Sequence, residues 1–220
     1  MTDHPVARLL GEAMAGRFPA VDGGWTRVEP WAPGLEAVLA FTGHAVIAVG
    51  SDVSDRRLAS WGMDGLGRAH DPRLVADLAG RGGWVDSLDA VLVTRGAGGR
   101  PGEGGELVPR PDLEDHPRVA YARGVRRDVH AYGRPTGRDV VVTLGQGLGG
   151  LNELGVELGG AALGTGGAAY LIGQARALVP TSEPLVAAVA PGNARALRAF
   201  LSAGFRPVAS VQLWRPSPHR

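Results

Sequence analysis

The stretch that most constrains this chain lies near its C-terminus, where an apolar run meets a sharp break and then a short amphipathic pattern. Residues 185–190 are apolar, and they are followed at once by Pro191-Gly192 and then by Asn193. The run predicts a buried strand, the asparagine predicts a helix N-cap, and Gly204 predicts the end of that helix. One face of the helix is expected to be buried, because apolar residues recur at helical spacing. These are Leu197, Phe200 and Leu201.

The composition excludes several kinds of site. The chain has 220 residues, 44% of them hydrophobic, which is enough for one large domain or for a domain plus a substantial extension. It has no cysteine, so a disulfide framework and a thiol nucleophile are excluded. All 23 basic residues are arginine, which excludes a Walker A P-loop and a Schiff-base lysine. The histidines show no metal-ligand spacing, so no metal is expected.

Charge and hydropathy bear on location and partners. The formal net charge is +1, so no strong field attracts nucleic acid or a membrane surface, and we expect neither as a partner. The first residues have no basic segment followed by an apolar one, and no apolar run approaches the roughly 20 residues of a spanning helix. We therefore expect a cytoplasmic protein.

The order of predicted elements is that of an α/β protein. A glycine-rich stretch at residues 96–105 predicts a linker, and we place a boundary there between an N-terminal α/β extension (1–98) and a second domain (99–220). In the extension the patterns predict a helix at 5–17, a β-hairpin at 36–49, a helix from 72 and a strand at 88–94. In the second domain they predict a helix at 117–125, strands at 127–132, 139–144 and 152–158, a helix at 168–178, the strand and helix described above, and a strand pair over 205–214.

The third strand of the second domain, residues 152–158, alternates cleanly. Asn152, Leu154, Val156 and Leu158 face one side of the sheet, and Glu153, Gly155 and Glu157 face the other. A glycine-rich loop at residues 159–167 follows and leads into a helix. Backbone N–H groups and the positive end of the helix dipole make such a turn suitable for an anion such as a pyrophosphate.

The C-terminal motif matches a known sequence pattern. Residues 193–205 read Asn-Ala-x-Ala-Leu-x-x-Phe-x-x-x-Gly-Phe. This resembles the last helix of the GNAT-type N-acetyltransferases, whose usual form is Asn, then Ala three positions on, Leu-Tyr and Gly-Phe. The order of elements over residues 113–214 is similar to a GNAT core from its second helix onward. The resemblance implies a GNAT-like acyl-CoA N-acyltransferase fold with a mixed sheet, acetyl-CoA as co-substrate, a primary amine as acceptor and, commonly, a homodimer.

The resemblance also implies a cofactor site. In the family the loop before the helix reads Arg/Gln-x-x-Gly-x-Gly/Ala and cradles the pyrophosphate of coenzyme A. The matching stretch is residues 161–166, where the two glycines fit and Ala161 replaces the Arg or Gln. The expected cofactor contacts are Glu157, Leu158, Gly164, Thr165, Gly166, Gly167, Ala168, Asn193 and Phe200.

The expected chemistry centres on Glu153. Acetyl transfer needs a neutral amine and a polarised thioester carbonyl, and in the family an acidic residue near the strand before the loop often acts as base. We predict Glu153 as this base; the alternative is that the two glutamates pair with Arg127 or Arg138, or are solvated. Phe200 stands where the family usually has the tyrosine that protonates the leaving thiolate, a proton that water can also supply.

Other interpretations stay open. Loss of the loop arginine and the helix tyrosine favours a catalytically degenerate GNAT-fold protein that binds an acyl-CoA or regulates a partner. Residues 145–150 match G-x-G-x-x-G, but a strand follows them and no acidic residue lies between Glu157 and Glu183, so a glycine hairpin is favoured over a nicotinamide site. Asp115-His116-Pro117 is an acid–base pair or, as we favour, a helix cap. The extension could complete the fold, be a decayed second copy of it, or form a lid.

Overall fold

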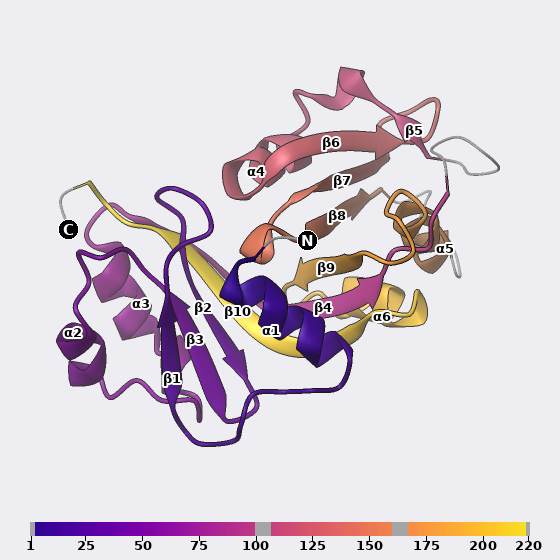
Figure 1. Cartoon of the computed structure of the whole chain (residues 1–220). Coiled ribbons are helices and arrows are strands. Elements are labelled where there is room, and N and C mark those ends of the chain that lie inside the picture. Colours follow the sequence, from indigo (N-terminus) through magenta and orange to yellow (C-terminus); the bar gives the residue numbers. More distant parts are fainter. Residues whose placement is uncertain (1–2, 100–106, 160–166, 219–220) are drawn as a thin grey trace. The chain divides into compact units, whose positions relative to one another are not determined.

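The chain divides into two compact units (Figure 1). The computed structural model describes residues 3–99, 107–159 and 167–218. The C-terminal unit consists mainly of residues 92–207, and the N-terminal unit consists of residues 4–91 together with 208–220. The division thus falls inside two strands, β4 (Trp84–Arg95) and β10 (Arg206–Arg215), and not at residue 98. Glycine-rich composition marks a loop, but the long-range strand pairing that defines a compact unit leaves no mark in composition.

The C-terminal unit is a mixed sheet with helices on both faces. Its strand order is β4-β9-β8-β7-β6-β5; β5, β6, β7 and β8 pair antiparallel in turn, and β8 pairs parallel with β9. Its strands besides β4 are β5 (Val108–Pro109), β6 (Arg127–Gly133), β7 (Val140–Gln146), β8 (Asn152–Leu158) and β9 (Pro184–Val189). Its helices are η2 (Pro111–Leu113), α4 (Pro117–Val125), η3 (Leu148–Gly150), α5 (Gly167–Arg176) and α6 (Ala194–Ser202).

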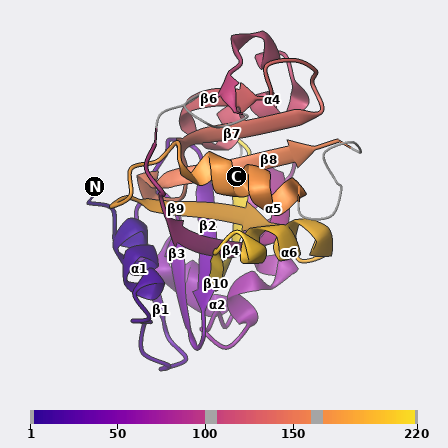
Figure 2. The same ribbon diagram turned by 90° about the vertical axis from the view of Figure 1, so that its right-hand side faces the viewer.

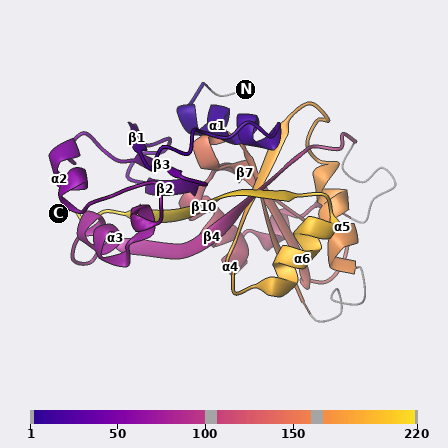
Figure 3. The ribbon, with the colours of Figure 1, turned by 90° about the horizontal axis from the view of Figure 1, so that it is seen from below.

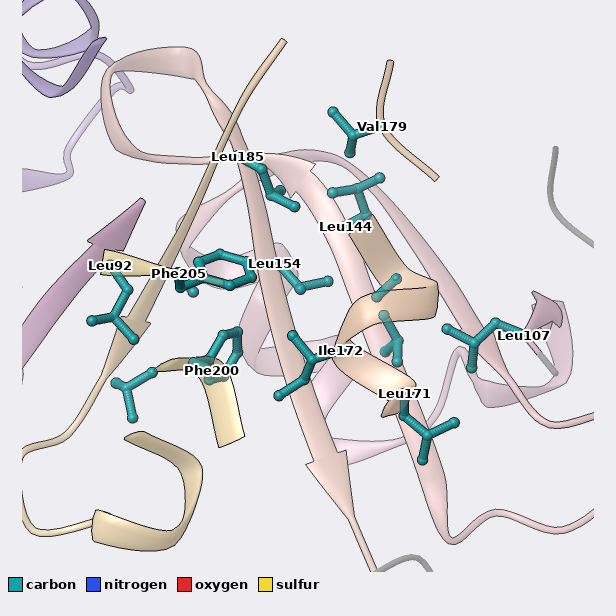
Figure 4. Close-up of a cluster of buried hydrophobic side chains, with 14 of the residues drawn as sticks. Leu92, Leu107, Leu144, Leu154, Leu171, Ile172, Val179, Leu185, Phe200 and Phe205 are labelled. Atoms are coloured by element: carbon teal, nitrogen blue, oxygen red, sulfur yellow. The ribbon is translucent and has the colours of Figure 1, made fainter. Parts of the chain in front are cut away.

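The predicted alternation of β8 separates two environments. Leu154 belongs to the main apolar cluster of this unit, against which Val156 and Leu158 pack, together with side chains of α5 and α6. Figure 2 shows α5 and α6 side by side over β8 and β9, and Figure 4 shows how Phe200, Ile172 and Leu154 meet in this cluster. The other face of β7 carries Val141, which packs with Val119 of α4. The sheet is therefore covered by α5 and α6 on one face and by α4 on the other.

Helix α6 forms as the sequence predicts, with one difference. Asn193 caps it, its Oδ1 accepting a hydrogen bond from the Ala196 N–H at 3.1 Å, and Gly204 follows its end with a φ of 85°. Phe200 is buried and meets Phe205 edge to face at 5.0 Å between ring centroids. Leu201 is 46% exposed, so its predicted burial is wrong. It lies about 100° around the helix from Phe200 and falls outside a narrow buried stripe.

The N-terminal unit is a second mixed sheet segment, with strand order β1-β3-β2-β10-β4. The predicted hairpin is confirmed: β2 and β3 pair antiparallel, with Phe41 opposite His44, while β1 pairs parallel with β3. Figure 3 shows α1 and α3 on opposite sides of β2 and β3. The elements are α1 (Pro5–Met14), β1 (Trp25–Val28), β2 (Glu36–Phe41), β3 (His44–Ala48), α2 (Asp55–Ser60), η1 (Arg68–His70) and α3 (Pro72–Ala79).

The C-terminal strand belongs largely to the N-terminal unit. The strand pair predicted over 205–214 is one continuous strand, β10, which pairs antiparallel with β2 so that Trp214 lies opposite Glu36. Both residues are buried, and the Trp214 Nε1–H donates to Glu36 Oε2 at 2.9 Å. The other Glu36 oxygen accepts from the Gly50 N–H at 2.8 Å. These bonds satisfy a carboxylate that would otherwise be costly to bury.

A half-buried histidine of the N-terminal unit is sensitive to acid. His70 Nε2 lies 2.8 Å from Ser210 Oγ, and within the described residues its buried Nδ1 has no hydrogen-bond partner. Burial lowers the pKa of His70 from its ordinary value of 6.5 to about 4. The folded state thus disfavours the charged imidazole.

We expect this histidine to make the protein less stable in mild acid. Because the folded pKa is depressed, the stability is fully present above pH 6.5 and is lost as the pH falls from there toward 4. At about 1.4 kcal/mol per pKa unit, His70→Gln should remove about 2 kcal/mol of the wild-type loss in unfolding free energy between pH 7 and pH 5. Urea denaturation at both pH values measures this. The exposed His130→Gln is the control, and equal acid sensitivity in His70→Gln and wild type would contradict the assignment.

Candidate functional site

The parallel strands β8 and β9 pair only where they begin. Within the described residues their register consists of Asn152 opposite Leu185 and Glu153 opposite Val186, although β8 runs on to Leu158 and β9 to Val189. On its other side β8 pairs with β7 along its whole length. Alternate backbone groups of a strand point to each neighbour, so past Glu153 the N–H and C=O groups on the β9 side of β8 have no strand partner among the described residues and are available to a ligand.

A cavity of about 280 Å³ lies beside the diverging part of β8. Most of its lining residues are apolar, and the three charged or amide residues on its rim, Glu157, Asn193 and Arg195, are exposed; Glu157 borders the cavity from strand β8, whose alternation turns its side chain toward the other face. A cavity with an apolar interior and a few polar groups suits a mainly apolar chain with a polar or anionic end. The lining residues are Val156, Glu157, Leu158, Ala168, Ile172, Asn193, Arg195, Ala196, Ala199 and Phe200.

The cavity brings together five of the residues predicted for the cofactor. These are Glu157, Leu158, Ala168, Asn193 and Phe200. Gly167 is the first residue of α5, next to Ala168. The predicted contacts Gly164, Thr165 and Gly166 lie outside the described residues, as does Ala161.

Two of the predicted cofactor contacts, Asn193 and Phe200, also have structural roles. The Asn193 Oδ1 caps α6, which leaves the side-chain amide N–H₂ to donate to a ligand. Phe200 is only 2% exposed and belongs at once to the cavity wall and to the apolar cluster, so this wall supplies no proton donor at the position of the usual tyrosine.

Sequence reasoning missed several lining residues of the cavity. Ile172 lies four positions after Ala168 on α5, and Ala196 and Ala199 lie three and six positions after Asn193 on α6. Helical spacing from the predicted contacts could have found all three, because residues three or four apart share a helix face.

Glu153 lies on the opposite face of β8, in a buried network. It is 5% exposed, and its Oε1 accepts from Arg126 Nη2 at 2.6 Å while its Oε2 accepts from the Leu148 N–H at 3.0 Å. Arg126 also donates from Nη1 to Thr143 Oγ1 at 3.2 Å. The partner is therefore Arg126, and not the Arg127 or Arg138 considered from the sequence. The role of Glu153 as base stays a prediction; its observed contacts are those of a positioning residue.

The structure explains the two other sequence motifs, the glycine-rich stretch at residues 145–150 and Asp115-His116, without a nicotinamide site or an acid–base pair. Residues 145–150 lead from β7 through the single 3-10 turn η3 into β8, so no helix opens there as a dinucleotide site requires. The His116 Nδ1 accepts from the Arg118 N–H at 3.2 Å and so caps α4, while Asp115 pairs with Arg138 at 2.5 Å. Asp115 and His116 thus serve separate partners rather than an acid–base pair.

A second hollow lies at the other end of the two parallel strands. It measures about 550 Å³ and is mainly polar, with the Asn152 Nδ2 donating to Glu183 Oε2 at 2.7 Å on its wall. The described ranges contain no cluster of three or more acidic or histidine side chains that could hold a metal ion. None of the helices that the structure describes is both long and apolar enough to cross a membrane.

Comparison with known proteins finds similarity among solved structures alone, and that similarity is low. No family model matches the chain, and no curated protein matches it. A solved structure described as an acetyltransferase of the GNAT family from Novosphingobium aromaticivorans is 22% identical, with 62% of this chain and 68% of that chain covered and a TM-score of 0.40. A GCN5-related N-acetyltransferase from Kribbella flavida is 15% identical, with 68% and 65% covered and a TM-score of 0.38.

We expect the Arg126–Glu153 pair to be costly to break. Arg126→Met leaves a buried carboxylate without its counter-ion, which should lower the unfolding free energy by about 3–5 kcal/mol. Removing both charges in Arg126→Met/Glu153→Met should recover a large part of this loss, because no lone charge stays buried. Urea denaturation of the single and double variants measures the coupling. The neighbouring Arg127→Met, at an exposed position, is the control, and additive losses would contradict the pairing.

Proposed function

We propose that this protein is an N-acetyltransferase that transfers an acetyl group from acetyl-CoA to a primary amine by direct attack. The main observation in its support is the cavity at the diverging end of β8. Five of its lining residues, from β8, α5 and α6, are ones that the GNAT resemblance assigns to coenzyme A.

The cavity residues divide the work of binding. Val156, Ile172 and Phe200 offer an apolar wall to an extended acyl-carrying arm. Asn193 and Arg195 lie at the mouth, at the N-terminus of α6, where N–H groups and a positive side chain favour anionic groups. Backbone N–H groups of β8 on the side where β9 has diverged are suited to polarise a thioester carbonyl.

In the proposed transfer step, each bond and proton is accounted for by the two substrates, water and residues of the site. The acceptor nitrogen attacks the thioester carbonyl carbon, the carbon–sulfur bond breaks, and the nitrogen loses one proton. We assign that proton to Glu157, which is exposed and lines the cavity, since both oxygens of Glu153 are already hydrogen-bonded. Phe200 cannot donate, so the departing thiolate takes its proton from water.

A second candidate function is an acyl-CoA-binding or regulatory protein without transferase activity. It is favoured by Phe200, which places an apolar ring where the family usually has an acid, and by Ala161 in the loop. The two functions agree on the cavity and differ on turnover, so binding and catalysis must be measured separately.

We expect filling the cavity to abolish binding of acetyl-CoA. Calorimetric titration of the wild-type protein should give a micromolar dissociation constant, and Ala196→Phe should weaken it at least tenfold because the added ring occupies the cavity. Ser202→Phe, at an exposed position of the same helix, is the matched control, and NADH is the control ligand. Absence of acetyl-CoA binding to wild type up to millimolar concentration would overturn the proposed N-acetyltransferase function.

We expect the two glutamates of β8 to behave differently. Glu157→Gln should reduce kcat about 10²- to 10⁴-fold, the usual contribution of a general base, with little change in melting temperature. Glu153→Gln should lower the melting temperature, because it removes the charge that Arg126 needs. Thiol release from acetyl-CoA with a panel of amines measures the rates. A stable Glu153→Gln without activity beside an active Glu157→Gln would return the base to Glu153, and wild-type binding without thiol release would favour the second function.

A further inference from the structure

Two arginines lie directly over one glycine of β8. A Cβ atom on Gly155 would stand 2.7 Å from Thr143 Oγ1, 2.8 Å from Arg126 Nη1 and 3.0 Å from Arg118 Nη2, so a larger residue would displace these side chains. Arg118 is the second residue of α4, and Arg126 follows the end of that helix. Helix α4 thus brings two positive charges to the face of β8 that also carries Glu153 and Glu157.

The two arginines are not equally satisfied. Arg126 donates to Glu153 and to Thr143. Within the described residues, by contrast, no hydrogen bond or ion pair engages the Arg118 guanidinium; its buried Nε has no partner, and its contact is with the Tyr121 ring, 5.6 Å from Cζ. The charges of Glu157 and Glu153 act on Arg118 from a distance, but a half-buried guanidinium whose Nε has lost its hydration without a hydrogen-bond partner is costly. Burial, and next the charge of Arg126, lower the pKa of Arg118.

We propose that Arg118 binds a carboxylate group of the acceptor substrate, so that the acceptor is an amine that also carries a carboxylate. The planar guanidinium presents paired donors that match a carboxylate, and stacking on Tyr121 holds one of its faces. Glu157 lies two residues beyond Gly155 on the same face, a step of about 7 Å along the strand. Because Arg118 lies over Gly155 and its charge interacts with that of Glu157, one small molecule can place its amine at Glu157 and its carboxylate at Arg118. The inference rests on the proposed function.

The binding part of this inference can be tested without any turnover. We expect sodium propionate, at constant ionic strength, to raise the melting temperature of the wild-type protein saturably and to have no effect on Arg118→Met. Arg118→Lys should retain a weaker response, since its ammonium cannot bind in the bidentate manner. Arg123→Met is the matched control: Arg123 lies on the same helix, is exposed and pairs with Glu114. An equal response in Arg118→Met and wild type, or no response in either, overturns the site.

Rates of acetyl transfer then test whether the acceptor carries a carboxylate. Among amino acids and their carboxamides offered with acetyl-CoA, wild type should favour the free acids, and Arg118→Met should lose at least tenfold in kcat/KM for the acids, mostly through KM, while the amides are unchanged. Equal losses for acids and amides overturn the assignment. Inorganic phosphate in the melting assay distinguishes a general anion site, which it would occupy as well as propionate does. If acetyl-CoA does not bind wild type, the proposed function fails, whereas the propionate result still decides whether Arg118 is an anion site.

Discussion

The parting of β8 from β9 is the constraint on which the rest of the C-terminal unit depends. The last residue of β8 in register with β9 is Glu153, and its carboxylate is held by Arg126 and by the Leu148 N–H. The point where the strands separate is thus pinned by a buried ion pair. A β8 free to shift along β9 would move the free N–H groups and the cavity together, so the ion pair serves the site even though it lies on the other face of the sheet.

Because side chains alternate along a strand, the seven residues of β8 present an apolar face on one side of the sheet and a charged face on the other. The side chains of Leu154, Val156 and Leu158 belong to the apolar side, where α5 and α6 leave room for a cavity. On the other side Glu153 and Gly155 meet the arginines of α4. A side chain at this point would displace both guanidinium groups, so Gly155 leaves the room that the charged layer occupies.

Sequence patterns predicted the features that depend on residues close together in the chain. The Asn193 cap, the alternation of β8 and the hairpin of β2 and β3 depend on neighbours in sequence, and all are confirmed. The pairing of β10 with β2, which joins residues some 175 positions apart, left no local signal. The partner of Glu153 could not be predicted for a related reason, because nothing in the sequence distinguishes Arg126 from Arg127 or Arg138. The junction of α4 with β6 turns Arg126 inward and leaves Arg127 exposed.

The apolar wall at Phe200 and the charges on the far face of β8 together restrict how two substrates can meet. Phe200 is packed against Phe205, so a polar group there would be buried without a partner, and the cavity interior stays apolar. In the proposed transfer, a charged amine is disfavoured in such an interior and approaches from the face of β8 that carries Glu157. Where the sheet is closed, β8 separates the two sides; past Glu153 its edge is open. For the proposed transferase, this division of β8 is the reason to propose direct transfer across that open edge, with no covalent intermediate on the protein.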